Sequence, residues 1–395
     1  MTSAFVIISI IVLDAITLKG IIRGFPQFFA RCRRGLRIAF IVQSAVAAAI
    51  VLGGLFQRYV DDYRLIALYY HFFGAVAAIY IPKAAYAALL FADLKIKATS
   101  RLRLAKYGLW ACMPFVLLVV WGILFGRYNF TVEQVELTSD SLPHDFDGYK
   151  IVQLSDIHTG SFAGAAHRFK KAVDLVNEQK PDLIVMTGDI VNNFADELTA
   201  FIPVFSQLKA VDGKYAVLGN HDYGGYFKWK NPADSVANIN AIKSAIVKMG
   251  FVLLNNQATT ISRYDTNHIA LIGVENWGIL KRFPKRADLK KAMEPVNDMP
   301  FKIVLAHDPS FWTKEIKDKS DVALTLTGHT HGMQMGVKIG NKRYGPAPLF
   351  PRFRYWAGLY QGGNQYLYVN RGLGVIGFPA RIGMPPEITV ITLRN

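Results

Sequence analysis

The sequence predicts a membrane region of four helices followed by an α/β domain. Four long apolar runs occupy the first 126 of the 395 residues. The remaining chain contains five short apolar segments of the kind typical of buried strands, and each is followed within a few residues by aspartate, asparagine or histidine. The predicted strands are Ile151–Leu154, Leu183–Met186, Tyr215–Leu218, Ile303–Leu305 and Val322–Leu326.

Each of the four apolar runs is expected to cross a membrane, because a spanning helix needs about 20 mostly apolar residues. The first run is the shortest and contains Asp14, but it lacks the basic start and the cleavage site of a signal peptide. We therefore expect an integral membrane protein of the bacterial inner-membrane type. The expected spans are about residues 4–22, 38–56, 65–91 and 107–125, within a membrane region of residues 1–126.

The basic residues between the spans predict which side of the membrane each loop faces. Residues 19–37 carry six Lys or Arg and no acid, and residues 93–106 carry five against one acid. Residues 58–64 are balanced, with two arginines and two aspartates. Because loops rich in Lys and Arg remain in the cytoplasm, both termini and the domain of residues 127–395 are expected outside it, which means the periplasm of a Gram-negative cell.

Charge and cysteine content exclude other classes of site. The net charge is +16, of which +10 lies in the first 126 residues, where the loop pattern already explains it, so no nucleic-acid partner is expected. Cys32 and Cys112 both fall in the membrane region, so any metal in the α/β domain is held by oxygen and nitrogen.

In the third span, Lys83 is expected to extend to the membrane surface and His71 to bond within the bundle.

Five polar motifs follow the five predicted strands. Side chains at the carboxyl ends of strands in α/β sheets meet at one edge, where ligands bind. Carboxylate, imidazole and amide groups suit Zn, Mn, Fe or Mg ions, and Asp189 is placed to bridge two such ions for phosphoryl transfer. The motifs are Asp156-Ile157-His158, Gly188-Asp189, Gly219-Asn220-His221-Asp222, Leu305-Ala306-His307-Asp308 and Gly328-His329-Thr330-His331-Gly332.

Together these motifs resemble those of the calcineurin-like metallophosphoesterase family, and the segments 370–374 and 385–388 are similar to its membrane-anchored branch. The resemblance covers roughly residues 148–393. It implies a two-sheet αββα sandwich with two divalent metal ions at one rim, and hydrolysis of phosphate mono- or diesters by a metal-bound hydroxide. It assigns the first ion to Asp156, His158 and His331 and the second to Asn220, His307 and His329, with Asp189 bridging.

Two catalytic roles are also implied by the resemblance. His221 matches a histidine that is not a ligand and acts near the leaving-group oxygen, and Asp222 is expected to orient its ring. The sequence departs from the family at two positions. Asn192 stands where an acid is often found, which removes a charge near the ligands. Met333 stands where the family has glycine, so this side chain is expected either to shape substrate access or to pack.

Two stretches outside the motifs each allow two interpretations. The basic stretch 281–291 is expected either to form a solvated helix face or to meet anionic lipid or a phosphorylated substrate. The aromatic segment 344–360 follows the last motif, and core packing fits it as well as a wall that grips a lipid-like substrate does.

The expected function is hydrolysis of a phosphate ester by a membrane-anchored enzyme, with an amphiphilic, lipid-linked substrate suggested by the membrane region. The main alternative is a pyrophosphatase of a nucleotide-activated acylated sugar, of the UDP-diacylglucosamine type, but that substrate is cytoplasmic. A non-catalytic metal-binding receptor or scaffold is disfavoured, because such a protein would be free to lose His221. The metals, the substrate, the ester class and the oligomeric state stay open.

Overall fold

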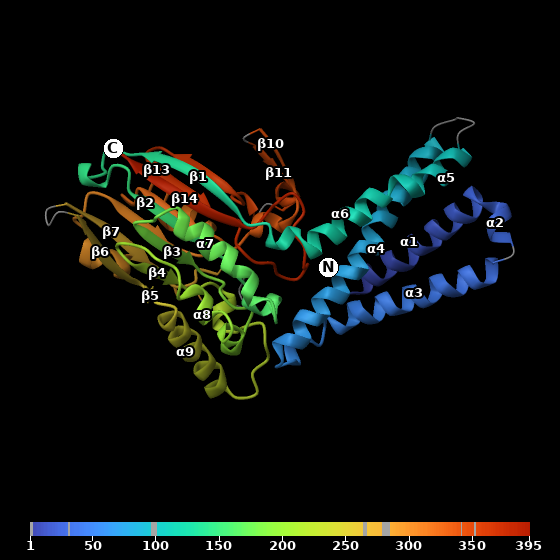
Figure 1. The fold of residues 1–395 in the computed structure, drawn as a ribbon, viewed down its shortest axis with the longest axis horizontal. Helices are drawn as coiled ribbons and strands as arrows, with labels where there is room; N and C mark the ends of the chain where they lie inside the picture. The colour runs from blue at the N-terminus through green and yellow to red at the C-terminus, as the bar shows by residue number, and fades with distance from the viewer. Residues whose placement is uncertain are drawn as a thin grey trace. The chain divides into compact units, whose positions relative to one another are not determined.

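The computed structural model describes residues 3–30, 32–95, 101–263, 267–278, 285–340, 342–350 and 353–395. The chain packs as two compact units (Figure 1). The first unit comprises Met1–Val60, Leu68–Phe125 and Phe378–Ala380, and the second comprises Asp61–Ala67, Gly126–Gly377 and Arg381–Asn395.

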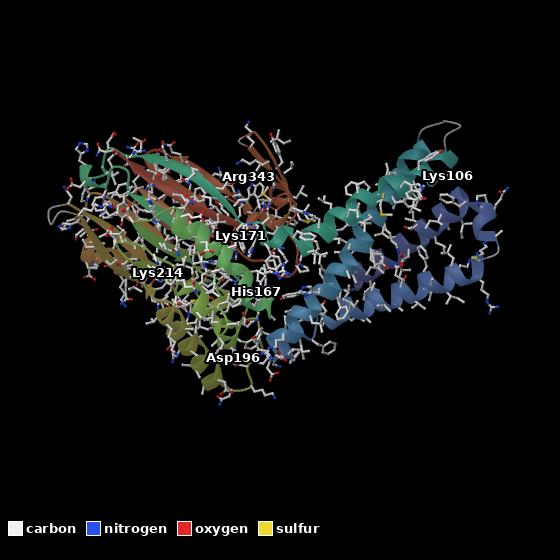
Figure 2. The ribbon with its side chains drawn as sticks, in the orientation of Figure 1. Lys106, His167, Lys171, Asp196, Lys214 and Arg343 are labelled. Carbon is white, nitrogen blue, oxygen red and sulfur yellow. The ribbon has the colours of Figure 1, made fainter. Side chains whose placement is uncertain are left out.

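The first unit is helical. Four stretches of the described chain are long and apolar enough to cross a membrane, namely Ser3–Gly24, Arg33–Gly53, Tyr63–Phe91 and Lys106–Tyr128, which confirms the four expected membrane helices. Most of the exposed large hydrophobic side chains of the described residues lie on these helices, as expected for a surface that faces lipid (Figure 2). The helices are α1 (Ser3–Gly24), α2 (Pro26–Ala30), α3 (Arg33–Gly53), α4 (Tyr63–Lys95), α5 (Arg101–Ala111) and α6 (Met113–Leu124).

A buried ion pair joins α1 to α4. Lys83 donates to Asp14 Oδ1, while the hydroxyls of Tyr80 and Ser44 donate to Asp14 Oδ2 at 2.6 and 2.5 Å. Asp14 is 4% exposed. The expectation that Lys83 extends to the membrane surface is therefore wrong, because a carboxylate 69 residues earlier in the chain gives the ammonium a partner inside the bundle.

The second unit contains two six-stranded sheets in the described residues. The first consists, in spatial order, of β1 (Thr131–Thr138), β14 (Glu387–Arg394), β2 (Lys150–Leu154), β3 (Leu183–Thr187), β4 (Lys214–Val217) and β5 (Val252–Leu253). The second consists of β12 (Gly358–Gly362), β13 (Gln365–Val369), β9 (Leu324–Thr327), β8 (Lys302–Leu305), β7 (Asn267–Gly273) and β6 (Gln257–Arg263). A separate hairpin pairs β10 (Val337–Ile339) with β11 (Lys342–Tyr344).

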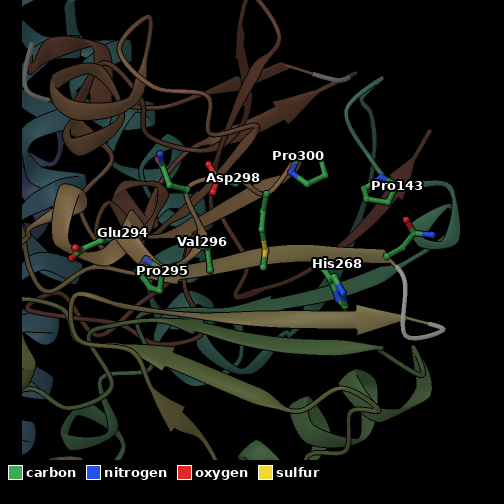
Figure 3. Close-up of a pocket in the computed structure, with 10 residues that line it drawn as sticks. Pro143, His268, Glu294, Pro295, Val296, Asp298 and Pro300 are labelled. Atoms are coloured by element: carbon green, nitrogen blue, oxygen red, sulfur yellow. The ribbon is translucent and has the colours of Figure 1, made fainter.

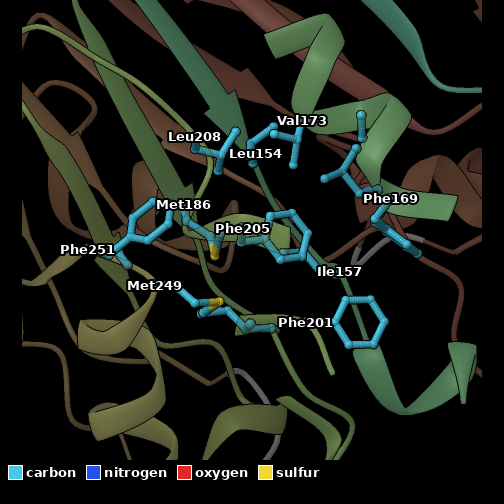
Figure 4. Close-up of a cluster of buried hydrophobic side chains, with 14 of the residues drawn as sticks. Leu154, Ile157, Phe169, Val173, Met186, Phe201, Phe205, Leu208, Met249 and Phe251 are labelled. Atoms are coloured by element: carbon cyan, nitrogen blue, oxygen red, sulfur yellow. The ribbon is translucent and has the colours of Figure 1, made fainter. Parts of the chain in front are cut away.

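Alternation along the strands of the first sheet builds two layers of core. Val152 and Leu154 of β2 face the helices and pack with Val173 of α7 (Lys170–Glu178), with α8 (Ile202–Phe205) and with α9 (Pro232–Lys248). Figure 4 shows this cluster, and Figure 1 shows these helices along one face of the sheet. Ile151 of β2 faces the other way and packs against the second sheet through Leu305 and Leu326. Adjacent residues of a strand thus serve different layers.

The far face of the second sheet is covered in its turn. Ile272 of β7 and Val304 of β8 pack with Ala292 of α10 (Leu289–Met293) and with Trp312 and Ile316. Helices, two sheets and a further helical layer therefore follow one another, which confirms the αββα sandwich.

All five predicted strands are confirmed and correspond to β2, β3, β4, β8 and β9, although β4 ends one residue before Leu218 and β9 begins two residues after Val322. Strands β2, β3 and β4 run parallel to one another, and so do β8 and β9. In each sheet the carboxyl ends of these neighbours lie at one edge, and this arrangement positions the polar motifs.

Candidate metal centre

The structure brings six of the seven predicted ligands, all except Asn220, into two close groups beyond the carboxyl ends of these strands. Within each of two groups, one ligand atom per residue lies within 4.8 Å of the others. A third group of the same kind overlaps both and includes His221. The first two groups are Asp156 with His158 and His331, and Asp189 with His307 and His329.

Turns with left-handed backbone carry most of these side chains. Asp156, His158, Asp189, His329 and His331 have φ between 48° and 72°, a region uncommon for residues other than glycine. They are five of the ten non-glycine residues with positive φ in the described chain. Such conformations cost about 1–3 kcal/mol each and persist where the surrounding structure enforces them. Because half of the strained residues lie at this edge, the contacts that position their side chains must offset the free-energy cost of the strained backbone.

Two motif glycines let neighbouring turns approach closely. A Cβ atom at Gly188 would overlap the backbone nitrogen of Gly219, and a Cβ atom at Gly219 would overlap the side chain of Asp189. A larger residue at either position would push the turns after β3 and β4 apart. The glycines therefore set the distance between Asp189 and the motif that begins at Gly219.

In the first group, His158 Nε2 lies 3.0 Å from His331 Nε2, and His331 Nε2 lies 3.2 Å from Asp156 Oδ1. The other ring nitrogen of His158, Nδ1, lies 3.1 Å from the side-chain oxygen of Asn192. Because that oxygen can only accept, Nδ1 carries the proton of the neutral ring. His158 Nε2 therefore presents a lone pair toward His331 and Asp156.

In the second group, His307 Nε2 lies 3.1 Å from Asp189 Oδ2 and 3.1 Å from His329 Nδ1. His307 Nδ1 donates to the carbonyl oxygen of Thr187 at 2.8 Å. Asp189 Oδ2 also lies 3.6 Å from His158 Nε2. The carboxylate of Asp189 thus faces both groups, as a bridging ligand must.

These contacts fit two cations. In the first group the lone pair of His158 Nε2 points at a second imidazole nitrogen, and in the second group His307 Nε2 lies 3.1 Å from both a carboxylate oxygen and an imidazole nitrogen. A positive ion between such atoms would stabilise either arrangement. Nitrogen and oxygen donors of this kind suit Zn, Mn, Fe or Mg ions. The residues that would hold the ions are Asp156, His158 and His331 for one, and Asn220, His307 and His329 for the other, with Asp189 between them.

The pKa values show that the centre favours positive charge next to Asp189. Burial by itself lowers the pKa of His307, but Asp189 outweighs this effect and raises it to about 10. Burial would raise the pKa of Asp189, yet His307 and His221 hold it well below its usual range. A proton on His307 therefore balances Asp189 in the metal-free protein, and a divalent ion would replace that proton.

Comparison with known proteins identifies the family. Residues 149–333 match the model of the calcineurin-like phosphoesterases. The chain is 34% identical over 307 residues to the uncharacterised metallophosphoesterase YkuE of Bacillus subtilis, which covers 76% of this chain and 99% of that protein. The chain belongs to the calcineurin-like metallophosphoesterases. It is therefore a metal-dependent hydrolase of phosphoric ester bonds, from a family that uses a dinuclear divalent metal centre.

Two further relatives of this metallophosphoesterase are informative. A transmembrane protein with a metallophosphoesterase domain from Bos taurus is 32% identical over 292 residues, which cover 72% of this chain and 62% of the bovine protein. Phosphodiesterase YaeI of Escherichia coli is 30% identical over 247 residues, 62% of this chain and 82% of that protein. Similarity to a transmembrane protein, together with the four apolar helices, supports a membrane protein.

His221 lies at the accessible side of the metallophosphoesterase centre, since it is partly exposed where His158 and Asp189 are buried. Its Nδ1 donates to the carbonyl oxygen of Asn192 at 2.8 Å. This hydrogen bond leaves Nε2 as the ring nitrogen available to a substrate. The backbone amide of His221 donates to Asp189 Oδ1 at 2.8 Å, which ties the residue to the bridging carboxylate.

The expectation that Asp222 orients the His221 ring is wrong. Asp222 accepts hydrogen bonds from three backbone amides, those of Ile190, Val191 and Gly219, at 2.8, 3.0 and 2.8 Å. Adjacent residues of the short 3₁₀ turn at His221–Tyr223 project in different directions, so the two side chains part. Asp222 instead ties the turn after β3 to the turn after β4.

Asn192 takes over the contact expected of Asp222. The sequence indicates only a lost charge at this position, but the Asn192 side chain holds His158 Nδ1 and its carbonyl holds His221 Nδ1. One residue thus orients a predicted ligand and the predicted acid. Its place three residues after Asp189, where the family often has an acid, was the signal that could have revealed this role.

Glu197 fixes the segment that contains Asn192. It is 1% exposed and accepts hydrogen bonds from the backbone amides of Gly160 and of residues 192–194, at 2.6–2.9 Å. Arg381 acts similarly on the other side of the centre, where its buried guanidinium donates to the carbonyl oxygens of Arg371 and Gly374 at 2.7 and 2.6 Å. No motif in the sequence marks either residue.

The aromatic segment packs within the domain only in part, because Tyr344 and Phe350 are exposed. The ring of Tyr355 lies 5.4 Å from that of Trp312 and 4.9 Å from that of Tyr360. The carbonyl of Trp356 accepts from the Thr330 hydroxyl at 2.6 Å, so the segment supports the turn between His329 and His331. Met333 packs partly buried beside Trp356, which favours the packing alternative for that side chain. A contact of the segment with substrate stays a prediction.

The basic stretch is only partly described, because residues 281–284 lie outside the described residues. Lys285 Nζ lies 4.4 Å from the centre of the Trp277 ring, and the guanidinium of Arg286 lies 5.1 Å from that of Tyr223. The charged groups of Lys285 and Arg286 are therefore in contact with aromatic rings of the domain. Binding of lipid or substrate by the rest of the stretch stays a prediction.

A surface pocket of about 330 Å³ lies away from the centre (Figure 3). Its lining includes His268 and Pro300, near the amino ends of the parallel strands β7 and β8, together with Glu294 and Asp298. The predicted ligands follow the carboxyl ends of the strands. The pocket therefore lies at the opposite edge of the second sheet and takes no part in the metal centre.

Replacing Asp189 by Asn tests the shared ligand. The change preserves size but removes the negative charge that faces both groups, so we expect metal content and hydrolysis to fall by at least about 100-fold. Metal analysis of the folded protein and an ester-hydrolysis assay check this. Asp174→Asn, an exposed change on α7, serves as the control. Two ions per chain with near-normal turnover in Asp189→Asn would contradict the assignment.

Metal affinity is expected to rise with pH between pH 7 and 9. Because Asp189 raises the pKa of His307 to about 10, the ring is protonated in the metal-free protein throughout this range, and a bound ion must displace the proton. The apparent affinity should increase about tenfold per pH unit. Calorimetry in buffers of different ionisation enthalpy should show about one proton released. An affinity that does not change with pH would refute the role of His307.

Proposed function

We propose that this metallophosphoesterase hydrolyses a phosphodiester of an amphiphilic, lipid-linked substrate. The observation that carries the reaction is the pair of ligand groups whose contacts converge on Asp189. The substrate class is supported by four apolar helices in the same chain. A lipid-linked ester is confined to the membrane that anchors the enzyme, and this raises the rate at which the two meet.

The ester class is supported by similarity to a protein named as a phosphodiesterase, YaeI of Escherichia coli. The two ligand groups suit monoesters and diesters equally, because either presents phosphate oxygens to two positive charges. The similarity therefore favours diesters over monoesters.

The chain's own residues orient the reaction. Two divalent ions, when bound, would supply positive charge to the phosphate and would activate water near neutral pH. Asp189 would hold the two ligand groups at a fixed separation. When Nε2 carries a proton as well as Nδ1, His221 would give the Nε2 proton, at the accessible side, to the departing alcohol oxygen, while the Asn192 carbonyl keeps the ring in place through Nδ1.

We also propose that the metallophosphoesterase domain lies outside the cytoplasm. The support is the distribution of Lys and Arg, with two strongly basic loops and one balanced loop between four spans. This orientation favours a lipid-linked ester over a nucleotide-activated sugar, because the latter is cytoplasmic.

Replacing His221 by Ala tests the proposed proton donor. We expect hydrolysis of a diester to fall by about 10²–10⁴-fold with metal content unchanged. The assay uses chromogenic mono- and diesters with Mn, Zn, Fe or Mg, and it also ranks the two ester classes. His167→Ala, at an exposed position labelled in Figure 2, is the control. Loss of both ions in His221→Ala would make His221 a ligand instead.

Reporter fusions after Asn395 test the orientation. A reporter that is active only outside the cytoplasm should work, and one that is active only inside should be silent. The reverse result would mean that one apolar run does not span, with the run containing Asp14 the first suspect. It would also favour the nucleotide-sugar pyrophosphatase over the lipid-linked ester.

A further inference from the structure

Tyr226 contacts two functional residues at once, although no motif includes it. Its hydroxyl accepts a hydrogen bond from the side-chain amide nitrogen of Asn220 at 3.0 Å. Its ring stacks on that of His221, with ring centres 4.0 Å apart and planes inclined by 11°. A single side chain thus touches a predicted ligand of the second ion and the predicted proton donor.

The hydrogen bond decides which end of the Asn220 amide is available to an ion. An amide offers one acceptor oxygen and one donor nitrogen, and a cation binds only the oxygen. Because Nδ2 is committed to the Tyr226 hydroxyl, Oδ1 is the atom left for the metal centre. Rotation of the amide by half a turn would break this contact and aim a donor at the cation.

The stack decides the orientation of the His221 ring. Nδ1 is held by the Asn192 carbonyl, one face lies against Tyr226, and the ring meets that of His158 edge-on at 4.7 Å and 88°. Rotation of the imidazole would break the hydrogen bond to the Asn192 carbonyl and the stack on the Tyr226 ring together. The direction of Nε2 therefore depends on the Tyr226 ring.

The loop that carries Tyr226 is itself anchored. Trp229 Nε1 donates to the Gly224 carbonyl at 2.8 Å and closes the loop. The rings of Phe227 and Trp229 lie 4.9 Å apart and pack at 5.1 and 5.9 Å against Phe194, whose backbone amide is held by Glu197. Tyr226 therefore lies in a loop that an aromatic cluster and a hydrogen bond hold against Phe194.

We propose that Tyr226 is a positioning residue that sets the Asn220 amide for the second ion and the His221 ring for the leaving group. The first role depends only on the metal centre. The second rests on the function proposed above.

The experiment separates the hydroxyl from the ring. Tyr226→Phe removes the hydrogen bond and keeps the stack, so the second Mn²⁺ should bind about tenfold more weakly in calorimetry. The ratio of rates for diesters with alkyl and p-nitrophenyl leaving groups should stay that of the unchanged protein. Tyr226→Leu removes both contacts and should weaken Mn²⁺ binding. It should also slow the alkyl ester by about 100-fold more than the p-nitrophenyl ester, which departs without a proton.

Tyr223→Phe is the matched control, because that hydroxyl lies in the same loop and donates to Glu275 at 3.0 Å. It should leave both the Mn²⁺ affinity and the rate ratio unchanged. Equal Mn²⁺ affinity in Tyr226→Phe and the control would overturn the role at Asn220. An equal loss of rate on both esters in Tyr226→Leu would overturn the role at His221. If the unchanged protein hydrolyses neither ester, the proposed function and the leaving-group role fail together, while Mn²⁺ affinity still decides the role at Asn220.

Discussion

The negative charge of Asp189 is the feature on which the catalytic edge depends. Its carboxylate faces a histidine of each ligand group, its second oxygen holds the backbone of His221, and its own carbonyl accepts from the amide of His158 at 3.2 Å. A carboxylate buried in this way is stable only with positive charge beside it. Turns from three strands are therefore arranged around the carboxylate of Asp189. Because this buried carboxylate is stable only beside a positive charge, the same site also favours binding of a metal ion.

Around this charge, the supporting contacts run mainly through the backbone. Asp222 and Glu197 each accept several amide hydrogens, Arg381 donates to carbonyl oxygens, and Asn192 uses both its side chain and its carbonyl. Apart from the Asn192 side chain, which holds the ring of His158, these groups hold turns rather than ligands. They explain how left-handed conformations at five ligand positions persist, since the turns are fixed from outside by buried polar groups.

The strands and the ligands could be predicted because their signals are local. Apolar segments of three to five residues mark β2, β3, β4, β8 and β9, and the motifs follow them closely. The supporting residues could not be predicted, because their partners are distant or are backbone atoms. Glu197 binds amides up to 37 residues away, and Asp222 lies beside His221 in sequence but not in its contacts. Lys83 was misjudged for the same reason, since nothing near it in sequence points to Asp14.

The pairing of Asp14 with Lys83 has a consequence for how the chain enters the membrane. During synthesis, α1 emerges long before α4, so its carboxylate first meets the bilayer alone. A single charged side chain at mid-membrane costs about 2.5–3.5 kcal/mol on insertion scales, and the same applies to Lys83. Ser44 of α3 donates to Asp14, but the carboxylate and the ammonium neutralise each other only when α1 and α4 meet. Stable integration of the first span is thereby coupled to arrival of the third, and these helices settle in the bilayer as a group rather than one at a time.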